Sequence, residues 1–317
     1  MTLLTNKLVL FKPMRILVAV FLAILEKILT VILIIMPEDC ALYLGARFGD
    51  LLFFLVKFTS YRNYLTNNVA LTFGDRFNEQ EKGCIARQGL EKIGKSLVEV
   101  FRFPLLNKWN LSKKVSIKGK EVLDKALAQG RGIILVSGHF GNWELAGAAI
   151  ALSGYKLATV IQDQSNPAAN SFLNHRRKSK GIKIISRYAD LRVLIKMLRE
   201  NYIVAMIADQ HGESLKVFGT FFGNRVSLQE GPGVLFALTG SPVIPIFIIR
   251  NQDDTHDVII EHAISLDDLQ ETGREGKIAV VSQRVSNALE KYISLYPDHW
   301  NWMYNRWDKL DIQKEIK

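Results

Sequence analysis

Apolar residues follow three different patterns along the chain. Residues 16–36 form a nearly continuous apolar run that ends before Pro37. From about residue 60 to residue 115, apolar positions recur every three to five residues, which is typical of amphipathic helices. From Val115 onward, short apolar runs alternate with helical patterns. Continuous apolar strands separated by helices predict an α/β fold, in which helices flank a central, mostly parallel sheet.

The strands of this sheet are expected at Gly132–Val136, Leu157–Ile161, Ile182–Ile185, Ile203–Ala208, Val243–Ile249 and Val258–Ile260. Helices are expected between most of them, including Asp190–Glu200 and Gly233–Thr239. The predicted organisation has three parts. Residues 1–60 form a membrane anchor with interfacial helices, residues 61–115 form a helical segment, and residues 116–317 form the α/β domain.

The N-terminal apolar run is about as long as a membrane-spanning helix, which needs roughly 20 residues. It is preceded by Lys7, Lys12 and Arg15. Glu26 and Lys27 interrupt it, and a charge at the centre of a span costs about 2.5–3.5 kcal/mol. Three interpretations stay open: a tilted single span, a helix lying in the membrane interface, and a buried core helix. A second apolar patch, Leu51–Phe58, adds to the expected membrane-contacting surface.

The chain is basic, with 41 Lys and Arg against 31 Asp and Glu in 317 residues and a net charge of +10. This excess favours an anionic partner, which nucleic acid, an anionic bilayer or a phosphorylated ligand would all provide. The apolar run and the lack of a nucleic-acid-binding motif argue against nucleic acid. Cys40 and Cys84 have no metal-like spacing, so neither a zinc site nor a disulfide framework is expected.

The chemistry is expected where the apolar strand ending at Val136 runs into the sequence SGHFGNWELAG at residues 137–147. In open α/β sheets, ligands bind beyond the carboxyl ends of the strands. His139 can take up a proton near neutral pH. Glu144 is expected to accept a hydrogen bond from His139 and fix its tautomer, as the acid of a serine hydrolase triad does. The alternative is a loop histidine beside a helix-start glutamate that the macrodipole favours.

Two reaction types are compatible with such a histidine. A membrane-anchored hydrolase would pair it with a nucleophilic serine, but Ser137 is its near neighbour and no G-x-S-x-G elbow occurs. A direct attack of a hydroxyl or of water on a carbonyl carbon needs donors for the oxyanion. Backbone N–H groups near Gly138–Gly141 or Gly231–Gly233 are the candidates.

The string His139-Phe140-Gly141-Asn142-Trp143-Glu144 resembles the signature of the lipid A biosynthesis acyltransferases, a family of the lysophospholipid acyltransferase superfamily. Further elements of that family are resembled by Ala208-Asp209-Gln210, Phe221-Phe222-Gly223, Gly231-Pro232-Gly233, Gly240–Pro245, Tyr296–Trp302 and Arg306-Trp307. This ordered set covers nearly the whole chain and is more specific than any one member. An E-G-T-R element, typical of glycerol-phosphate acyltransferases, is absent from the sequence.

The resemblance implies a membrane-associated enzyme that transfers a fatty acyl chain from acyl-carrier protein or acyl-CoA to a hydroxyl of a glycolipid. A late step of lipid A biosynthesis on a phosphorylated saccharide lipid is expected. The phosphatidylinositol mannoside acyltransferases share the signatures, so their acceptor is the alternative. The expected place is the bacterial inner membrane, with the site on the cytoplasmic side. No cofactor and no metal are expected.

The resemblance also implies roles for particular residues. Asp209 would add a second carboxylate to the site; the alternative is a turn-initiating residue. Asn142 is expected to bind substrate. One of Arg176 and Arg177 would face the acceptor phosphate, in a segment that holds six cations and no acid between residues 164 and 189. A solvated charged face is the alternative for this basic segment. Three tryptophans have two open interpretations, the membrane interface or the core: Trp300, Trp302 and Trp307.

Overall fold

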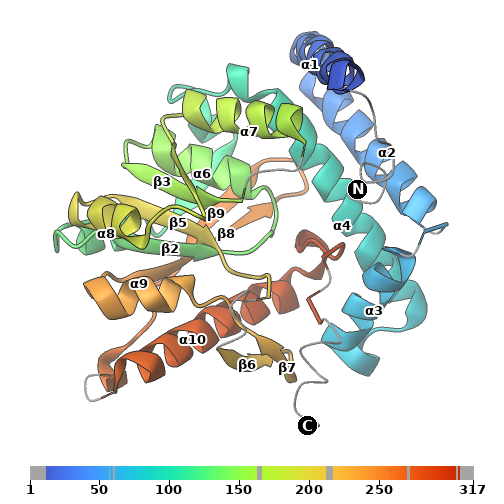
Figure 1. The fold of residues 1–317 in the computed structure, drawn as a ribbon. Coiled ribbons are helices and arrows are strands. Elements are labelled where there is room, and N and C mark those ends of the chain that lie inside the picture. The colour runs from blue at the N-terminus through green and yellow to red at the C-terminus, as the bar shows by residue number, and fades with distance from the viewer. Residues whose placement is uncertain are drawn as a thin grey trace.

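The structure, a computed structural model, describes residues 12–56, 58–59, 61–162, 166–211, 217–269, 272–304 and 306–307, and within these the side chains of all but residues 12–20, 23, 61–64 and 267. Lys7 therefore lies outside the described residues, as do the side chains of Lys12 and Arg15. The centre of the fold is a seven-stranded sheet with the order β1-β9-β8-β2-β5-β3-β4 (Figure 1). Neighbouring strands are parallel except β8 and β9. The predicted α/β fold with a mostly parallel sheet is confirmed.

The strands of this sheet are β1 (Val115–Lys118), β2 (Ile133–Ser137), β3 (Leu157–Ile161), β4 (Lys183–Ser186), β5 (Ile203–Ile207), β8 (Val243–Arg250) and β9 (His256–Ile260). Alternate side chains of each strand enter different cores. In β2, for example, Ile133 and Leu135 belong to one core, and Ile134 and Val136 to the other. Both faces are thus buried, which is why the strands read as continuous apolar runs.

Helices cover both faces of the sheet (Figure 1). One face carries α5 (Lys120–Leu127), α6 (Trp143–Leu152) and α7 (Pro167–Ser179). The other carries α8 (Leu191–Arg199), α9 (Gly231–Thr239) and α10 (Arg274–Leu295). Short 3₁₀ turns lie at Gly74–Arg76, Phe103–Leu105, Leu111–Lys113, Asp267–Leu269 and Pro297–His299. The helices predicted at Asp190–Glu200 and Gly233–Thr239 are confirmed as α8 and α9.

A two-stranded hairpin was not expected from the sequence. It consists of β6 (Phe218–Phe221) and β7 (Asn224–Ser227), which pair in the antiparallel direction. The two residues between them, Phe222 and Gly223, both have positive φ, at 49° and 73°. Two left-handed residues give the turn twist that suits a tight hairpin. The strands are too short for alternation to reveal them.

Four N-terminal helices pack beside the sheet: α1 (Lys12–Ile35), α2 (Glu38–Val56), α3 (Tyr61–Phe73) and α4 (Glu79–Phe101). Helices α2 and α4 cross backbone to backbone. A Cβ on Gly94 would lie 2.0 Å from the carbonyl oxygen of Gly45, and a Cβ on Gly49 would lie 2.4 Å from that of Leu90. Only glycine permits this approach, so the two helices form one rigid unit.

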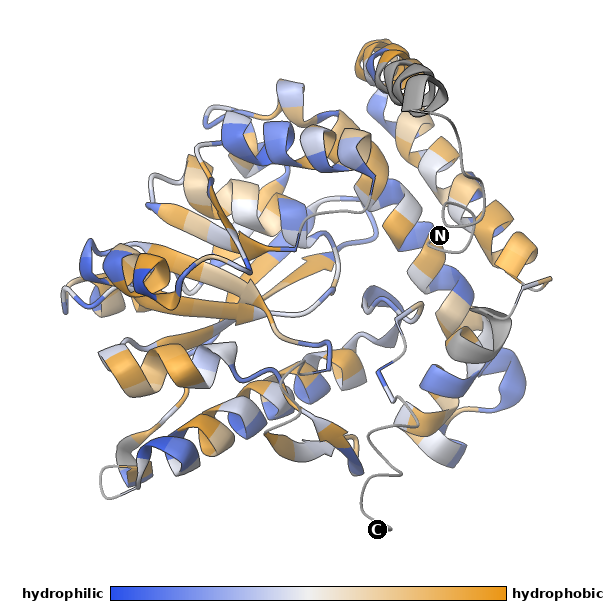
Figure 2. Ribbon diagram, viewed as in Figure 1, coloured by the Kyte–Doolittle hydropathy of each residue, from blue (hydrophilic) through white to orange (hydrophobic). Residues whose placement is uncertain are grey.

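Helices α1 and α2 are rich in apolar residues (Figure 2), and many of their large apolar side chains are exposed. This apolar face comprises Phe21, Ile24, Ile28, Val31, Ile32, Ile35, Tyr43, Phe48, Leu51, Phe54 and Phe58. Within the part of the chain that the structure describes, no helix is both long enough and apolar enough to cross a bilayer. The expectation of a transmembrane helix is therefore not met there. The exposure also corrects the core-helix interpretation of this run.

Glu26, the charge that complicated the apolar run, is held by a contact with the α/β domain. Thr30 Oγ1 donates to Glu26 Oε1 at 3.1 Å, and Arg176 Nη2 on α7 lies 3.0 Å from Thr30 Oγ1 and 3.4 Å from Glu26 Oε1. Burial lowers the pKa of Arg176, and the charge of Glu26 partly offsets this. The carboxylate of Glu26 thus faces the protein and connects α1 to α7.

This contact leads to a first prediction. Glu26→Ala leaves the buried Arg176 guanidinium without its carboxylate, and we expect a loss of about 1–3 kcal/mol in the free energy of unfolding. The measurement is urea unfolding of the detergent-solubilised protein. Lys27→Ala is the matched control, because Lys27 is exposed and such a change typically costs under about 0.5 kcal/mol. Equal losses in both variants would contradict the assignment.

Candidate active site

His139 lies where β2 passes into α6, at the carboxyl edge of the sheet. The neighbouring parallel strand is β5, and Asp209 follows it by two residues. Because adjacent parallel strands end at the same edge of the sheet, the side chains of His139 and Asp209 lie close together. His139 Nδ1 lies 2.9 Å from Asp209 Oδ1, and the His139 backbone N–H donates to Asp209 Oδ2 at 2.7 Å. Asp209 is buried, whereas the His139 side chain keeps 26% exposure.

The carboxylate beside His139 Nδ1 is therefore that of Asp209. This corrects the expectation that Glu144 accepts the hydrogen bond of the His139 ring. Glu144 lies in the first turn of α6 and is bound by Arg177 of α7 through two hydrogen bonds, at 2.8 and 2.5 Å. The indole of Trp143 also donates to Glu144, at 3.2 Å. The physical reason is that Asp209 holds both the backbone and the ring of His139, which fixes the ring on the β5 side. The catalytic role of Glu144 stays a prediction.

The pair of His139 and Asp209 changes both pKa values. Burial lowers the pKa of His139, but the charge and hydrogen bond of Asp209, with a smaller effect from Glu144, outweigh it and raise the pKa above 6.5. Burial raises the pKa of Asp209, but His139 and the indole of Trp300 outweigh it and lower that pKa. The carboxylate therefore holds the proton of Nδ1, and neutral His139 carries its lone pair on Nε2. Such an imidazole is a general base.

The segment that follows α10 holds this pair in place. Trp300 Nε1 donates to Asp209 Oδ2 at 2.8 Å. The backbone N–H of Gly141 donates to the carbonyl of His299 at 2.7 Å, and that of Asn301 to the carbonyl of His139 at 3.0 Å. Trp300, Trp302 and Trp307 are all buried, which favours the core interpretation. The role of Trp300 was missed, although a buried indole N–H needs an acceptor.

A cavity of about 530 Å³ opens beside His139. Its polar groups include His139, Glu144, Arg177, Arg187 and Gln210. One apolar wall lies between α6 and the sheet and includes Leu135, Ala146, Gly147, Ile150, Leu157 and Ala205; a second lies at α8 and α9 and includes Leu191, Leu194, Met206 and Gly231. Within the described ranges, no three His, Cys, Asp or Glu side chains group as metal ligands would. The cavity thus combines a basic histidine with apolar walls.

The cations of the basic segment have separate environments. Arg177 lines the cavity. Arg176 is buried against α1 through the contacts with Glu26 and Thr30, and Lys180 Nζ donates to the carbonyl of Leu106 at 2.6 Å. The structure therefore distinguishes between the two arginines: only Arg177 faces the site. A contact of either with an acceptor phosphate stays a prediction.

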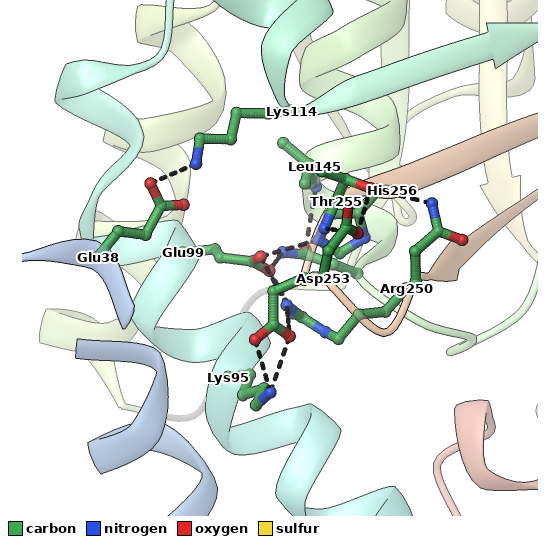
Figure 3. Close-up of polar contacts among 12 residues, drawn as sticks. Glu38, Lys95, Glu99, Lys114, Leu145, Arg250, Asp253, Thr255 and His256 are labelled. Carbon is green, nitrogen blue, oxygen red and sulfur yellow. Dashed lines mark hydrogen bonds and ion pairs between the residues drawn. The ribbon is translucent and has the colours of Figure 1, made fainter. Parts of the chain in front are cut away.

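Asn142 lies at the N-cap of α6 and is buried. Its side-chain oxygen accepts from the Leu145 backbone N–H at 3.0 Å, and Nδ2 donates to Glu99 Oε2 of α4 at 2.7 Å. Glu99 in turn meets Arg250 and His256 from β8 and β9 (Figure 3). Both polar groups of Asn142 are used inside the protein, so a direct contact with substrate stays a prediction.

The sequence of the chain can also be compared with the sequences of known proteins. Residues 10–309 match the sequence profile of the family described as bacterial lipid A biosynthesis acyltransferase. The chain belongs to this family, as its motifs indicated, and it is an acyltransferase. The resemblance stated from the sequence is confirmed.

Several curated relatives are similar over most of their length. A phosphatidylinositol mannoside acyltransferase of Mycobacterium tuberculosis is 26% identical over 227 residues, 69% of this chain and 68% of the relative. The lipid A biosynthesis myristoyltransferase of Escherichia coli is 21% identical over 237 residues, 74% and 72% of the two chains. The lipid A biosynthesis palmitoleoyltransferase of the same organism is 24% identical over 220 residues, 69% and 70%. The relatives therefore act on glycolipids of two kinds.

The raised pKa of His139 gives a second prediction. A general base must be neutral, so kcat/KM should rise with pH and level off above the His139 pKa, that is, above 6.5. Asp209→Asn removes the charge that raises this pKa. We expect the acidic limb to move to lower pH and kcat to fall by about 10²-fold or more. The measurement is a pH profile of acyl transfer for both proteins.

Trp300→Phe serves as the graded comparison for Asp209→Asn. It removes one hydrogen bond to Asp209 but keeps the carboxylate and most of the ring volume. We expect kcat to fall by a smaller factor, with the acidic limb not displaced to lower pH, because the carboxylate charge that raises the pKa of His139 is kept. An acidic limb that stays in place when Asp209 is neutralised would contradict the assignment of His139 as the base.

Proposed function

We propose that this acyltransferase moves a fatty acyl chain from an acyl thioester, carried by acyl-carrier protein, to a hydroxyl of a phosphorylated saccharide lipid in a late step of lipid A biosynthesis. The observation that carries the proposal is the His139–Asp209 pair beside a cavity with apolar walls. The family of the chain and the names of its relatives support the type of reaction.

In the proposed reaction, His139 Nε2 takes the proton of the acceptor hydroxyl while its oxygen attacks the thioester carbonyl. The tetrahedral intermediate collapses when the carbon–sulfur bond breaks, and the imidazolium returns the proton to the departing thiolate. Asp209 stabilises the imidazolium. The two candidate sets of oxyanion donors differ, because the N–H groups of His139 and Gly141 are already bound. The N-terminus of α9 at Gly231 lines the cavity and is the better candidate.

The acyl chain would occupy the apolar wall between α6 and the sheet. This placement follows from chemistry, because a hydrocarbon chain gains about 0.8 kcal/mol for each CH₂ removed from water. The thioester carbonyl would then lie at the mouth of this part, beside His139. The second apolar wall, at α8 and α9, leaves room for a hydrocarbon part of the acceptor.

The acceptor is proposed to carry phosphate, which the guanidinium groups of Arg177 and Arg187 on the cavity wall would meet. The alternative acceptor is a phosphatidylinositol mannoside. It is favoured by one specific observation, the similarity to the Mycobacterium tuberculosis enzyme. Both acceptors combine sugar hydroxyls with phosphate.

We also propose that the protein works at the bacterial inner membrane, with its site on the cytoplasmic side. The apolar face of α1 and α2 supports this, because monomeric soluble proteins rarely expose such large continuous patches. The net charge of +10 favours an anionic lipid surface.

The experiment is a purified transfer assay read by mass spectrometry. The donors are acyl-carrier-protein thioester and acyl-CoA. The acceptors are a lipid A precursor, its dephosphorylated form and a phosphatidylinositol mannoside. We expect one added acyl chain on the phosphorylated precursor. Thioester consumption at the same rate without any lipid would show a hydrolase and overturn the proposal, and transfer to the mannoside alone would establish the alternative.

A third prediction concerns Arg177. Arg177→Lys keeps the charge but loses the paired donors that bind Glu144. If Arg177 also holds the acceptor phosphate, KM should rise several-fold for the phosphorylated acceptor and little for the dephosphorylated one. Lys183→Gln is the control, because Lys183 is exposed and does not line the cavity. Equal losses with both acceptors would leave Arg177 only the task of holding Glu144.

A fourth prediction concerns Gly147, which lies on α6 at the apolar wall. A Cβ there would lie 3.6 Å from Ile182 Cδ1 and 3.8 Å from Leu157 Cδ2, which is ordinary contact. Gly147→Ala should therefore keep the donor preference, whereas Gly147→Leu fills part of the cavity and should favour a shorter acyl chain. The measurement is competition between acyl thioesters of different length. An unchanged preference in Gly147→Leu would place the acyl chain elsewhere.

A further inference from the structure

One face of α4 carries three charged residues that point toward the carboxyl edge of the sheet, where His139 lies. Lys92, Lys95 and Glu99 are spaced by three and four residues, so they lie on one side of the helix. Lys92 bonds Asp298, and Lys95 Nζ lies 2.8 Å from both carboxylate oxygens of Asp254. Asp298 directly precedes the residues that form hydrogen bonds with the turn that holds His139, called the catalytic turn below. The helix is thus attached to that region at several points.

Glu99 makes the most contacts of the three. Its carboxylate lies 2.9 and 2.6 Å from Arg250 Nη1 and Nη2, 2.8 Å from His256 Nε2 and 2.7 Å from Asn142 Nδ2. Figure 3 shows Arg250 and His256 turned toward it from β8 and β9. The side chain of Glu99 is 11% exposed and that of Arg250 is 5% exposed. A carboxylate with this many donors in a dry place has little freedom to move.

Two routes lead from this cluster to the turn that holds His139. The first is direct: Asn142 bonds Glu99 with its nitrogen and caps α6 with its oxygen. The second passes through Arg250, whose backbone N–H donates to His299 Nε2 at 3.1 Å. The carbonyl of His299 accepts from Gly141. Residues 141 and 142, just after His139, are therefore both held from the Glu99 side.

We propose that Glu99 is a positioning residue for the reaction: through Asn142 and Arg250 it fixes the backbone of the catalytic turn, so that His139 meets Asp209 and faces the cavity. This inference rests on the proposed role of His139 as the base. Neither the mechanism above nor the relatives' names assign a function to α4. Glu99 acts through other residues and lies behind the turn, on the side away from Asp209.

The electrostatics agree with this geometry. Burial raises the pKa of Glu99, but the charges and hydrogen bonds of Arg250 and His256 outweigh it and lower the pKa to about 2. The group is therefore a carboxylate at any pH at which the enzyme works. Its charge therefore stays constant over that pH range, unlike the charge of the His139–Asp209 pair.

The test uses Asn142→Ser, because serine keeps an oxygen that can cap α6 but lacks the nitrogen that bonds Glu99. We expect kcat to fall between about tenfold and a hundredfold, since small displacements of a reacting group have effects of this size. KM for donor and acceptor should stay within about twofold of the wild-type values, because displacing the base slows the chemical step and leaves substrate binding unchanged. The matched control is Asn78→Ser, the same exchange at the exposed N-cap of α4, which should leave kcat unchanged.

Two further measurements keep the proposal falsifiable. Glu99→Gln removes one of the two carboxylates that Arg250 contacts, the other being that of Asp254, and folding itself can suffer, so its melting temperature is recorded first. In a folded Glu99→Gln protein, adding Asn142→Ser should cost much less than it does in the wild type, because the shared contact is already weakened. Fully additive losses would overturn the proposal, as would an Asn142→Ser protein that behaves like Asn78→Ser.

The second measurement does not need catalysis. The ring of His139 is titrated by NMR, with its signal assigned by His139→Ala. Asn142→Ser should move the midpoint toward the ordinary value for histidine, while Asn78→Ser should leave it in place. An unmoved midpoint in Asn142→Ser overturns the positioning role. Failure of the wild type to transfer an acyl chain to any lipid would instead refute the proposed function, and the titration would still decide the role of Glu99.

Discussion

The contact between His139 and Asp209 is the interaction on which the rest of the site depends. It exists because β2 and β5 are neighbours in the sheet, which brings residues 70 positions apart in the sequence to one edge. A buried carboxylate is costly without partners, and here the ring and the backbone of His139 and the indole of Trp300 provide them. The same contacts that satisfy Asp209 orient the ring of His139. Stability and reactivity at this position therefore have one common source.

Around this pair, charges are arranged in separate, largely buried clusters. Glu144 and Arg177 form one on the cavity wall, and Glu99, Arg250 and His256 form another behind the catalytic turn. Each cluster joins elements of different parts of the fold: α6 to α7, and α4 to β8 and β9. Buried ion pairs add little net stability but penalise wrong arrangements strongly. They specify where the helices sit relative to the sheet, and the cavity takes its shape from those positions.

The sequence was sufficient for the fold class and most of the strands, and it placed the candidate site at the carboxyl edge of the sheet, where the structure brings His139 and Asp209 together. Continuous apolar runs report burial on both faces, and that signal is local. Asp209 was expected at the site from the resemblance, but its direct contact with His139 was not, because Glu144 is near in sequence whereas Asp209 becomes near only once the strand order is known. Glu99 was hidden within an ordinary amphipathic helix, and Trp300 within an aromatic segment compatible with core or membrane. The hairpin of β6 and β7 was missed because four-residue strands carry too little periodicity.

The contact of Trp300 with Asp209 has a consequence for synthesis on the ribosome. The helices α1 and α2 are made before the α/β domain. His139 and Asp209 emerge later, yet the tryptophan that completes their environment follows Asp209 by 91 residues. A chain broken off between these two positions would therefore hold both members of the pair but lack the indole donor to one oxygen of the buried carboxylate.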